Sequence, residues 1–182
     1  MLQKKSSDIH VYLLALLVPA SFGVAGQNSI AAAACGPESL QFDVNTGPYP
    51  PALPKPEPGN ALVYVVEDQV DPVCLRCVET ARIGFDGKWV GANRLDSWLS
   101  FQVQPGEHHL CADLQGRRRL RFDPKRISVA GFKAEPGAVY YFIARVTHTA
   151  YLGPLVDLEP MNRDEGEFLV SSYYPSSSRA RK

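Results

Sequence analysis

This chain of 182 residues lacks an excess of charge of either sign and lacks a long apolar run. Its 19 Lys and Arg residues balance 19 Asp and Glu residues, so the formal net charge is +0. That balance excludes a polyanion binder that works through overall charge, although a local basic cluster can still act. The apolar run of residues 11–25 is shorter than the ~20 residues of a transmembrane helix.

Local catalytic motifs are also missing. No serine lies in a G-x-S-x-G motif, no glycine-rich phosphate loop precedes a helix, and no two carboxylates are marked by their context as an acid and a base. Since each usual local signature fails, we expect a protein that is not an enzyme and that uses no cofactor.

The N-terminal region has the pattern of an export signal. Lys4 and Lys5 precede the short apolar run of residues 11–25, and small residues follow it. We therefore expect a signal peptide over residues 1–26 and a periplasmic or extracellular mature chain that starts near Gly26 or one residue later. An uncleaved N-terminal anchor is one alternative.

A second alternative is a lipoprotein. Residues 32–35 read A-A-A-C, which offers Cys35 as an acylated cysteine, and only then would the protein contact a membrane. Two features argue against it: Ala32 stands where a lipobox prefers leucine, and polar residues 27–29 separate the apolar run from the cysteine.

Four cysteines, Cys35, Cys74, Cys77 and Cys111, follow the apolar run. An even number in an oxidising compartment predicts two disulfides, with three possible pairings. We prefer two disulfides to the Cys74–Cys77 loop, one from Cys35 and one from Cys111, because cross-links that close long loops restrict the unfolded chain most. A local bridge between Cys74 and Cys77 stays open.

Most of the chain has a β pattern. Asp86-Gly87 lies between apolar pairs and predicts a tight hairpin, because Asp-Gly adopts positive φ at low cost. Asn162 or Asp164 is expected to cap one short helix that continues to Tyr173. Short strands bounded by Gly, Pro or Asp then predict an all-β fold, an antiparallel β-sandwich of about eight strands, with a barrel as the alternative. Strands are expected at residues 40–44, 61–66, 79–85, 88–90, 98–103, 107–113, 127–134, 138–146 and 155–158.

Two connections carry further expectations. Pro136-Gly137 is expected to join residues 127–134 and 138–146 as a second hairpin. Residues 47–59 contain six prolines, so this segment should run extended and polyproline-like, as a stiff strap that packs on the domain or as a linker. The expected organisation is a signal peptide (1–26), an N-terminal segment with the first strand (27–46), the proline-rich segment (47–59), a sandwich domain (60–175) and a basic disordered tail (176–182).

Several turn and core motifs resemble those of a bacterial family of exported domains of unknown function, the DUF2846 family. The central part is also similar to PEGA-type domains, which are small envelope-associated β-sandwiches. The resemblance covers residues 61–172 and implies an exported sandwich with no assigned chemistry, so it assigns no role to any residue here. The motifs are ALVYVV (61–66), GFDGKWVGA (84–92), VQPGEHHLCA (103–112), FKAEPGAVYYF (132–142) and LEPMNRDEGEFLV (158–170).

The cysteines also suggest chemistry. Cys74 and Cys77 form a C-x-x-C motif, but it runs into a strand pattern and lacks the helix N-terminus that activates a redox thiol, so a structural disulfide is the simpler interpretation. Together with Cys111 and His109, which strand alternation places on one face, this pair could bind zinc or act through thiols. His108, on the opposite face, is expected to bond a backbone carbonyl.

A basic cluster is one candidate for binding. It spans residues 117–126, and its candidate contact residues are Arg117, Arg119 and Arg121. Their guanidinium groups could pair with anionic groups of a partner, although a charged hairpin edge that blocks aggregation explains the cluster as well. With few aromatics near these arginines, nucleic acid is not an expected partner.

Aromatic side chains are the other candidates for binding. Trp89, Trp98 and Tyr141 could stack on sugars or anchor a protein, whereas packing in the core is the alternative. We therefore expect a binding or scaffolding module at the bacterial cell envelope, whose partner is an envelope protein or a polysaccharide.

Overall fold

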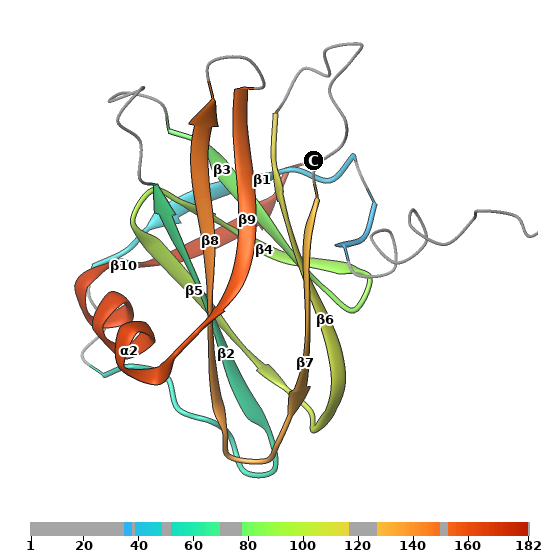
Figure 1. Ribbon diagram of the computed structural model, residues 1–182, viewed down its shortest axis with the longest axis vertical. Helices are drawn as coiled ribbons and strands as arrows, with labels where there is room; N and C mark the ends of the chain where they lie inside the picture. Colours follow the sequence, from blue (N-terminus) through green and yellow to red (C-terminus); the bar gives the residue numbers. More distant parts are fainter. Residues whose placement is uncertain are drawn as a thin grey trace, which may run out of the picture.

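The computed structural model describes residues 35–37, 39–48, 52–69, 78–116, 127–149 and 153–181. Two sheets face each other (Figure 1), so the predicted all-β sandwich is confirmed and the sheets do not close into a barrel. The larger sheet has the order β1(Phe42–Thr46), β10(Tyr174–Ala180), β5(Ser97–Val103), β2(Ala61–Gln69), β8(Val139–Thr149), β9(Gly153–Met161). The smaller sheet has the order β4(Lys88–Arg94), β3(Thr80–Phe85), β6(Gly106–Leu114), β7(Ser128–Ala134).

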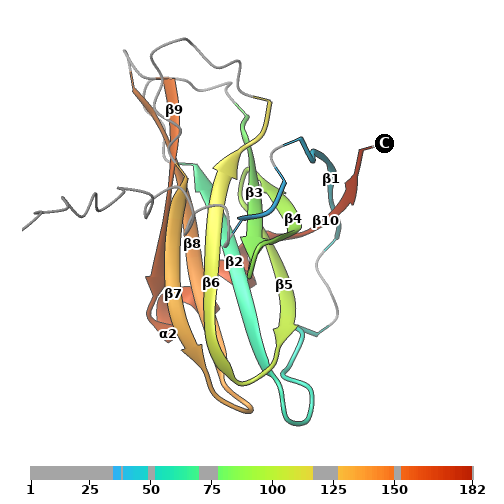
Figure 2. The same ribbon diagram turned by 90° about the vertical axis from the view of Figure 1, so that its right-hand side faces the viewer.

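Strand alternation places one apolar core between the sheets and another outside the larger sheet. On β2, Val63 and Val65 face the smaller sheet, whereas Tyr64 and Val66 face outward. The outward cluster is covered by helix α2(Arg163–Ser172), which in Figure 2 lies at the edge of the molecule opposite β1. The nearly continuous apolar run of β2 therefore reflects burial on both faces.

The two predicted hairpins have different outcomes. Asp86 (φ 45°) and Gly87 (φ 82°) connect β3 to its antiparallel partner β4, as expected. By contrast, the hairpin expected across Pro136-Gly137 is wrong, because β7 pairs with β6 whereas β8 lies between β2 and β9 in the other sheet. The burial patterns explain the difference: β7 alternates as an edge strand does, whereas residues 141–144 of β8 are all buried and need cover on both faces.

The larger sheet is mixed rather than purely antiparallel. Strand β8 runs parallel to β2, and β10 runs parallel to β5, while the remaining pairs are antiparallel. A parallel β2–β8 pair has a useful consequence for the surface. Residues in register, such as Tyr64 and Tyr141, lie side by side and project from the same face of the sheet.

The C-terminal residues are not a disordered tail, which corrects that expectation for the described residues up to 181. Ser176 to Ala180 belong to β10, which pairs along its length with β1. The serine hydroxyls also bond to the neighbouring strand β4: Ser178 Oγ accepts from the Ala92 N–H (3.1 Å), and Ser176 Oγ donates to Asn93 Oδ1 (2.7 Å). The polar composition therefore serves hydrogen bonding between strands.

The described part of the proline-rich segment, residues 52–59, packs on the sandwich, and we call it the strap. The Tyr64 hydroxyl donates to the Pro54 carbonyl (2.8 Å). The Gln102 side-chain amide donates to the Lys55 carbonyl (2.9 Å) and accepts from the Glu57 N–H (3.0 Å). The strap is thus extended and held by side chains, as a proline-rich chain without ladder hydrogen bonds must be.

Helix α2 begins as predicted at Asn162, whose side chain accepts from the Glu165 N–H (2.9 Å). Within the described ranges, no helix has the length and the apolar character needed to cross a bilayer. The expected signal peptide, the Cys74–Cys77 motif and the basic cluster of residues 117–126 lie outside the described residues.

Candidate functional site

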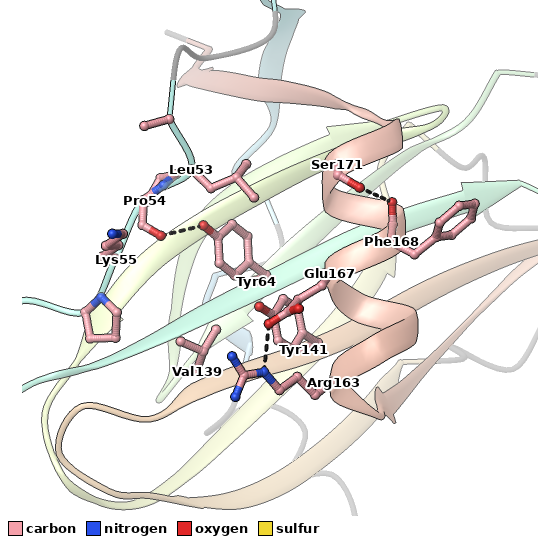
Figure 3. A pocket seen from close by; sticks show the side chains of 12 residues that line it. Leu53, Pro54, Lys55, Tyr64, Val139, Tyr141, Arg163, Glu167, Phe168 and Ser171 are labelled. Atoms are coloured by element: carbon pink, nitrogen blue, oxygen red, sulfur yellow. Dashed lines mark hydrogen bonds and ion pairs between the residues drawn. The ribbon is translucent and has the colours of Figure 1, made fainter.

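A groove lies on the outer face of the larger sheet, between the strap and helix α2 (Figure 3). Its volume is about 680 Å³. Tyr64 of β2 and Tyr141 of β8 form its floor, and their rings stack with centroids 5.4 Å apart and planes within 8°. The residues that line the groove are Ala52, Leu53, Pro54, Lys55, Pro56, Tyr64, Val139, Tyr141, Arg163, Glu167, Phe168 and Ser171.

A glycine lets helix α2 approach this floor closely. Gly166 is buried on the inner side of the helix, and a Cβ atom at this position would lie 2.2 Å from Cγ of Tyr141. Such a contact is far inside van der Waals distance, so any other residue would push the helix away from the ring. Gly166 therefore sets the separation between the helical wall and the floor of the groove.

The two tyrosine hydroxyls of the floor differ in their hydrogen bonds. Tyr64 donates to the Pro54 carbonyl of the strap, whereas the Tyr141 hydroxyl has no hydrogen-bond partner among the described residues. Burial is the main cause that raises the pKa of Tyr64 to about 12, and the charge of the neighbouring Tyr141 adds to it. Burial, with the charge of Glu167, also raises the pKa of Tyr141. Both hydroxyls therefore stay protonated and act as donors at neutral pH.

The rim of the groove is apolar with a charged mouth. Leu53 of the strap and Val139 of β8 are each 38% exposed, whereas the Phe168 ring, 66% exposed, lies on the side of α2 away from the strap (Figure 3). At the mouth, Arg163 Nε donates to Glu167 Oε1 (2.7 Å). Exposed apolar side chains beside a concave surface are typical of a binding site, because the free protein leaves them in water.

The structure separates the aromatic residues that the sequence offered for binding. Tyr141 lies in the groove. Trp98 is only 3% exposed, its indole N–H donates to the Tyr173 carbonyl (3.0 Å), and its ring packs edge-on beside Tyr64. Trp89 lies on β4 of the other sheet, where it stacks on Arg82 (4.4 Å). Only one of the three aromatic candidates therefore reaches the groove.

The three arginines that the sequence offered for binding are not part of this site as the structure describes it. Arg117, Arg119 and Arg121 lie in the stretch 117–126 between β6 and β7, which falls outside the described residues. The groove is lined instead by two other cations, Lys55 and Arg163. The role of the basic cluster in pairing with anionic groups stays a prediction.

Trp89 belongs to a different feature, the closed outer face of the smaller sheet. An N-terminal segment, of which residues 35–37, 39 and 40 are described, covers this face, and Cys35 is disulfide-bonded to Cys111 of β6. Buried Arg82 pairs with Asp113 and donates to the Leu40 carbonyl (2.6 Å), while the Trp89 indole N–H donates to the Pro37 carbonyl (2.6 Å). One covalent bond and one buried cation therefore hold the segment in place.

The Cys35–Cys111 bond shows that the preferred pairing through the Cys74–Cys77 loop is wrong. Alternation on β6 turns Leu110 and Ala112 into the core between the sheets and Cys111 outward, where the N-terminal segment crosses. The segment can lie so close because Gly36 (φ 103°) has no Cβ, which would otherwise lie 3.0 Å from the Gly87 carbonyl oxygen. Sequence spacing alone does not reveal this crossing.

The disulfide also removes Cys111 from the predicted metal or thiol cluster. Its sulfur is bonded to Cys35 and cannot act as a thiolate, while His109 is exposed on the same strand. Among the residues that the structure describes, no group of three or more His, Cys, Asp or Glu side chains is placed to hold a metal ion. Cys74 and Cys77 lie outside those residues.

His108 occupies the end of the sandwich near the Asp86-Gly87 turn. Its Nε2 bonds to the Gln104 carbonyl (2.7 Å), which confirms the expectation, and its Nδ1 bonds to Asp86 Oδ2 (2.7 Å). Burial lowers the pKa of His108, but the bonds to Asp86 and Gln104 outweigh it, so the net shift is upward. This arrangement fixes the turn and leads to no cavity that the structure describes.

Glu67 is a buried carboxyl that sequence reasoning missed, at the end of β2 in the space between the sheets. It is fully buried, and its Oε1 accepts from the Leu95 N–H (3.2 Å), whereas Oε2 has no partner in the described part of the chain. Burial raises the pKa of Glu67 to about 8; the charges of Asp96 and Glu79 add to this, and backbone hydrogen bonds oppose it. The continuous alternation of β2 could have placed this residue inward.

Comparisons with protein family models, with curated proteins and with solved structures found no match for this chain.

Proposed function

We propose that this protein is an exported, non-catalytic binding module of the bacterial cell envelope and that the groove between the strap and helix α2 is its binding site. One observation carries the proposal: Leu53 of the strap and Val139 of β8, which come from two separate elements, expose apolar surface around one concave site. Exposed anchors around a groove match what a partner buries on binding.

The proposed location has two supports. Residues 1–26 carry the pattern of an export signal, and the Cys35–Cys111 disulfide suits an oxidising compartment. The lipoprotein alternative would need the sulfur of Cys35 for a thioether. Because that sulfur is bonded to Cys111, we do not propose a lipid anchor.

The location is tested by the intact mass of the protein exported by its host, before and after reduction and alkylation. We expect a mass that starts near Gly26, with alkylation of Cys35 and Cys111 only after reduction. A retained N-terminus, a diacylglyceryl mass, or alkylation of these two cysteines without reduction would contradict the proposed exported form.

The binding site is tested with a photo-crosslinking amino acid placed at Val139 of the full-length protein in its host. The matched control places the same residue at Val90 of β4, which is 40% exposed and lies on the other sheet. We expect a discrete adduct from position 139 and none from position 90. Equal adducts from both positions, or none from position 139, would overturn the groove as the binding site.

A further inference from the structure

The strap shows how this surface holds an extended chain. Pro54, Pro56 and Pro58 give it a polyproline character, and its backbone is bonded by side chains rather than by a strand. The Tyr64 hydroxyl donates to one carbonyl, and the Gln102 amide donates to the next. An aromatic hydroxyl that donates to a carbonyl of a polyproline segment is the chemistry by which aromatic grooves recognise such segments in other chains.

The groove offers a second track of the same kind beside the strap. Tyr141 lies in register with Tyr64, its ring is parallel, and its hydroxyl points into the groove without a hydrogen-bond partner among the described residues (Figure 3). Val139 and Leu53 flank it with exposed apolar surface. A second extended segment between the strap and helix α2 would therefore meet one donor on an aromatic floor and two apolar walls.

The backbone around the groove limits what can lie there. Strands β2 and β8 are both paired on their two sides, so neither offers an open edge to an incoming strand. The strap cannot offer one either, because its prolines at 54, 56 and 58 have no N–H group. The backbone of an occupant therefore finds no strand with which to form ladder hydrogen bonds. This favours proline, because proline has no N–H group that needs a partner.

We propose, building on the proposed function, that the groove binds a proline-rich extended segment of a partner protein. One carbonyl of that segment accepts from the Tyr141 hydroxyl, and its apolar side chains contact Leu53 and Val139. The lining carries two cations, Lys55 and Arg163, and one anion, Glu167, so an acidic residue near the prolines is favoured.

The test uses a peptide with the sequence of residues 47–59, GPYPPALPKPEPG, titrated into the full-length protein and followed by calorimetry. Three variants accompany the wild type: Tyr141→Phe, which keeps the ring, Val139→Ser at an exposed position of the groove, and Val90→Ser as the control on the other sheet. We expect Tyr141→Phe to weaken binding about 5- to 10-fold, the size of one lost hydrogen bond. Val139→Ser should weaken it by a similar factor, and Val90→Ser should leave it unchanged.

Other results overturn the inference. Peptide binding that Tyr141→Phe and Val139→Ser leave unchanged would place the peptide elsewhere, for example in exchange with the strap. If a peptide in which alanine replaces every proline still binds, polyproline recognition is excluded. Binding of an oligosaccharide of N-acetylglucosamine, but not of the peptide, would assign the groove to a polysaccharide.

The same data distinguish a failure of this inference from a failure of the proposed function. If the peptide does not bind but position 139 still gives its crosslinked adduct, the groove is a binding site for another ligand and only the proline specificity is wrong. If neither the peptide nor the crosslink is observed, both proposals are wrong.

Discussion

The two outer faces of this sandwich are covered in different ways. On the smaller sheet, the N-terminal segment lies across β3, β4 and β6 and is fixed by the Cys35–Cys111 disulfide and by Arg82. On the larger sheet, the strap and helix α2 approach from two sides and leave the groove between them. A sandwich that must present one face and protect the other can therefore do so through its connecting segments, with the same strand alternation beneath both.

The energetic difference follows from the type of contact. The closed face is held by a covalent bond and by a hydrogen bond from the charged Arg82 guanidinium to the Leu40 carbonyl, which is stronger than a bond between neutral groups. The strap of the other face is held by neutral hydrogen bonds that water can replace. The groove face can thus change its contacts with little loss of stability.

The largest expected effect comes from removing the covalent part of the closed face. The double variant Cys35→Ala, Cys111→Ala opens a loop with a sequence separation of 76 residues. We expect the free energy of unfolding, measured by chemical denaturation, to fall by about 3 to 4 kcal/mol, because the unfolded chain is no longer restricted. Wild-type protein that has been reduced and alkylated should behave like the variant. A loss below about 1 kcal/mol would show that the disulfide does not hold this face closed.

A smaller effect is expected on the groove face from Gly166→Ala. The new methyl group would overlap the Tyr141 ring, so the helix must move outward, at a cost of about 2 kcal/mol. Ser171→Ala on the exposed side of the same helix is the matched control, with a change within about 0.5 kcal/mol. Thermal and chemical denaturation measure both variants. Equal stability of Gly166→Ala and wild type would contradict the close approach of α2 to the floor.

The smallest effect, counted for a change of one pH unit, comes from Glu67, which lies between the sheets and belongs to neither outer face. Because its folded-state pKa of about 8 lies above the ordinary value of 4.5, the folded protein binds the additional proton between these pH values. This contribution to stability is complete below pH 4.5 and is lost as the pH rises toward 8, by at most about 1.4 kcal/mol per pH unit.

The variant Glu67→Gln isolates that contribution, since it keeps the shape of the side chain and removes the titration. The difference in the free energy of unfolding between variant and wild type should shift in favour of the variant from pH 5 to pH 8. A difference that stays constant over this range would show that Glu67 is ionised in the folded protein.

Local signals in the sequence predicted local structure well. The Asp86-Gly87 turn, the Asn162 cap and the alternation on β2 and β6 act within a few residues, so the printed sequence contains their causes. The hairpin expected over Pro136-Gly137 failed because its two strands enter different sheets, and a turn motif does not say which sheet a strand joins.

Features that depend on contacts between distant segments were not predictable. The serines of β10 looked like a solvated tail because their partners on β4 are more than 80 residues away. The disulfide required knowledge that the N-terminal segment crosses β6, and the groove required the strap, Tyr141 and α2 to meet. Of the aromatic candidates, only Tyr141 reaches the groove, because alternation decides which face a strand residue takes but not what covers that face.

The central claim is that ligands enter only on the face between the strap and helix α2. The most direct test is a two-dimensional amide correlation spectrum of the full-length protein, titrated with the peptide of residues 47–59. The account predicts shifts at amides of the strap, of β8 near Tyr141 and of α2, with unchanged amides around Cys111 and Arg82. Shifts concentrated on the closed face, or no shifts at saturating peptide, would contradict it.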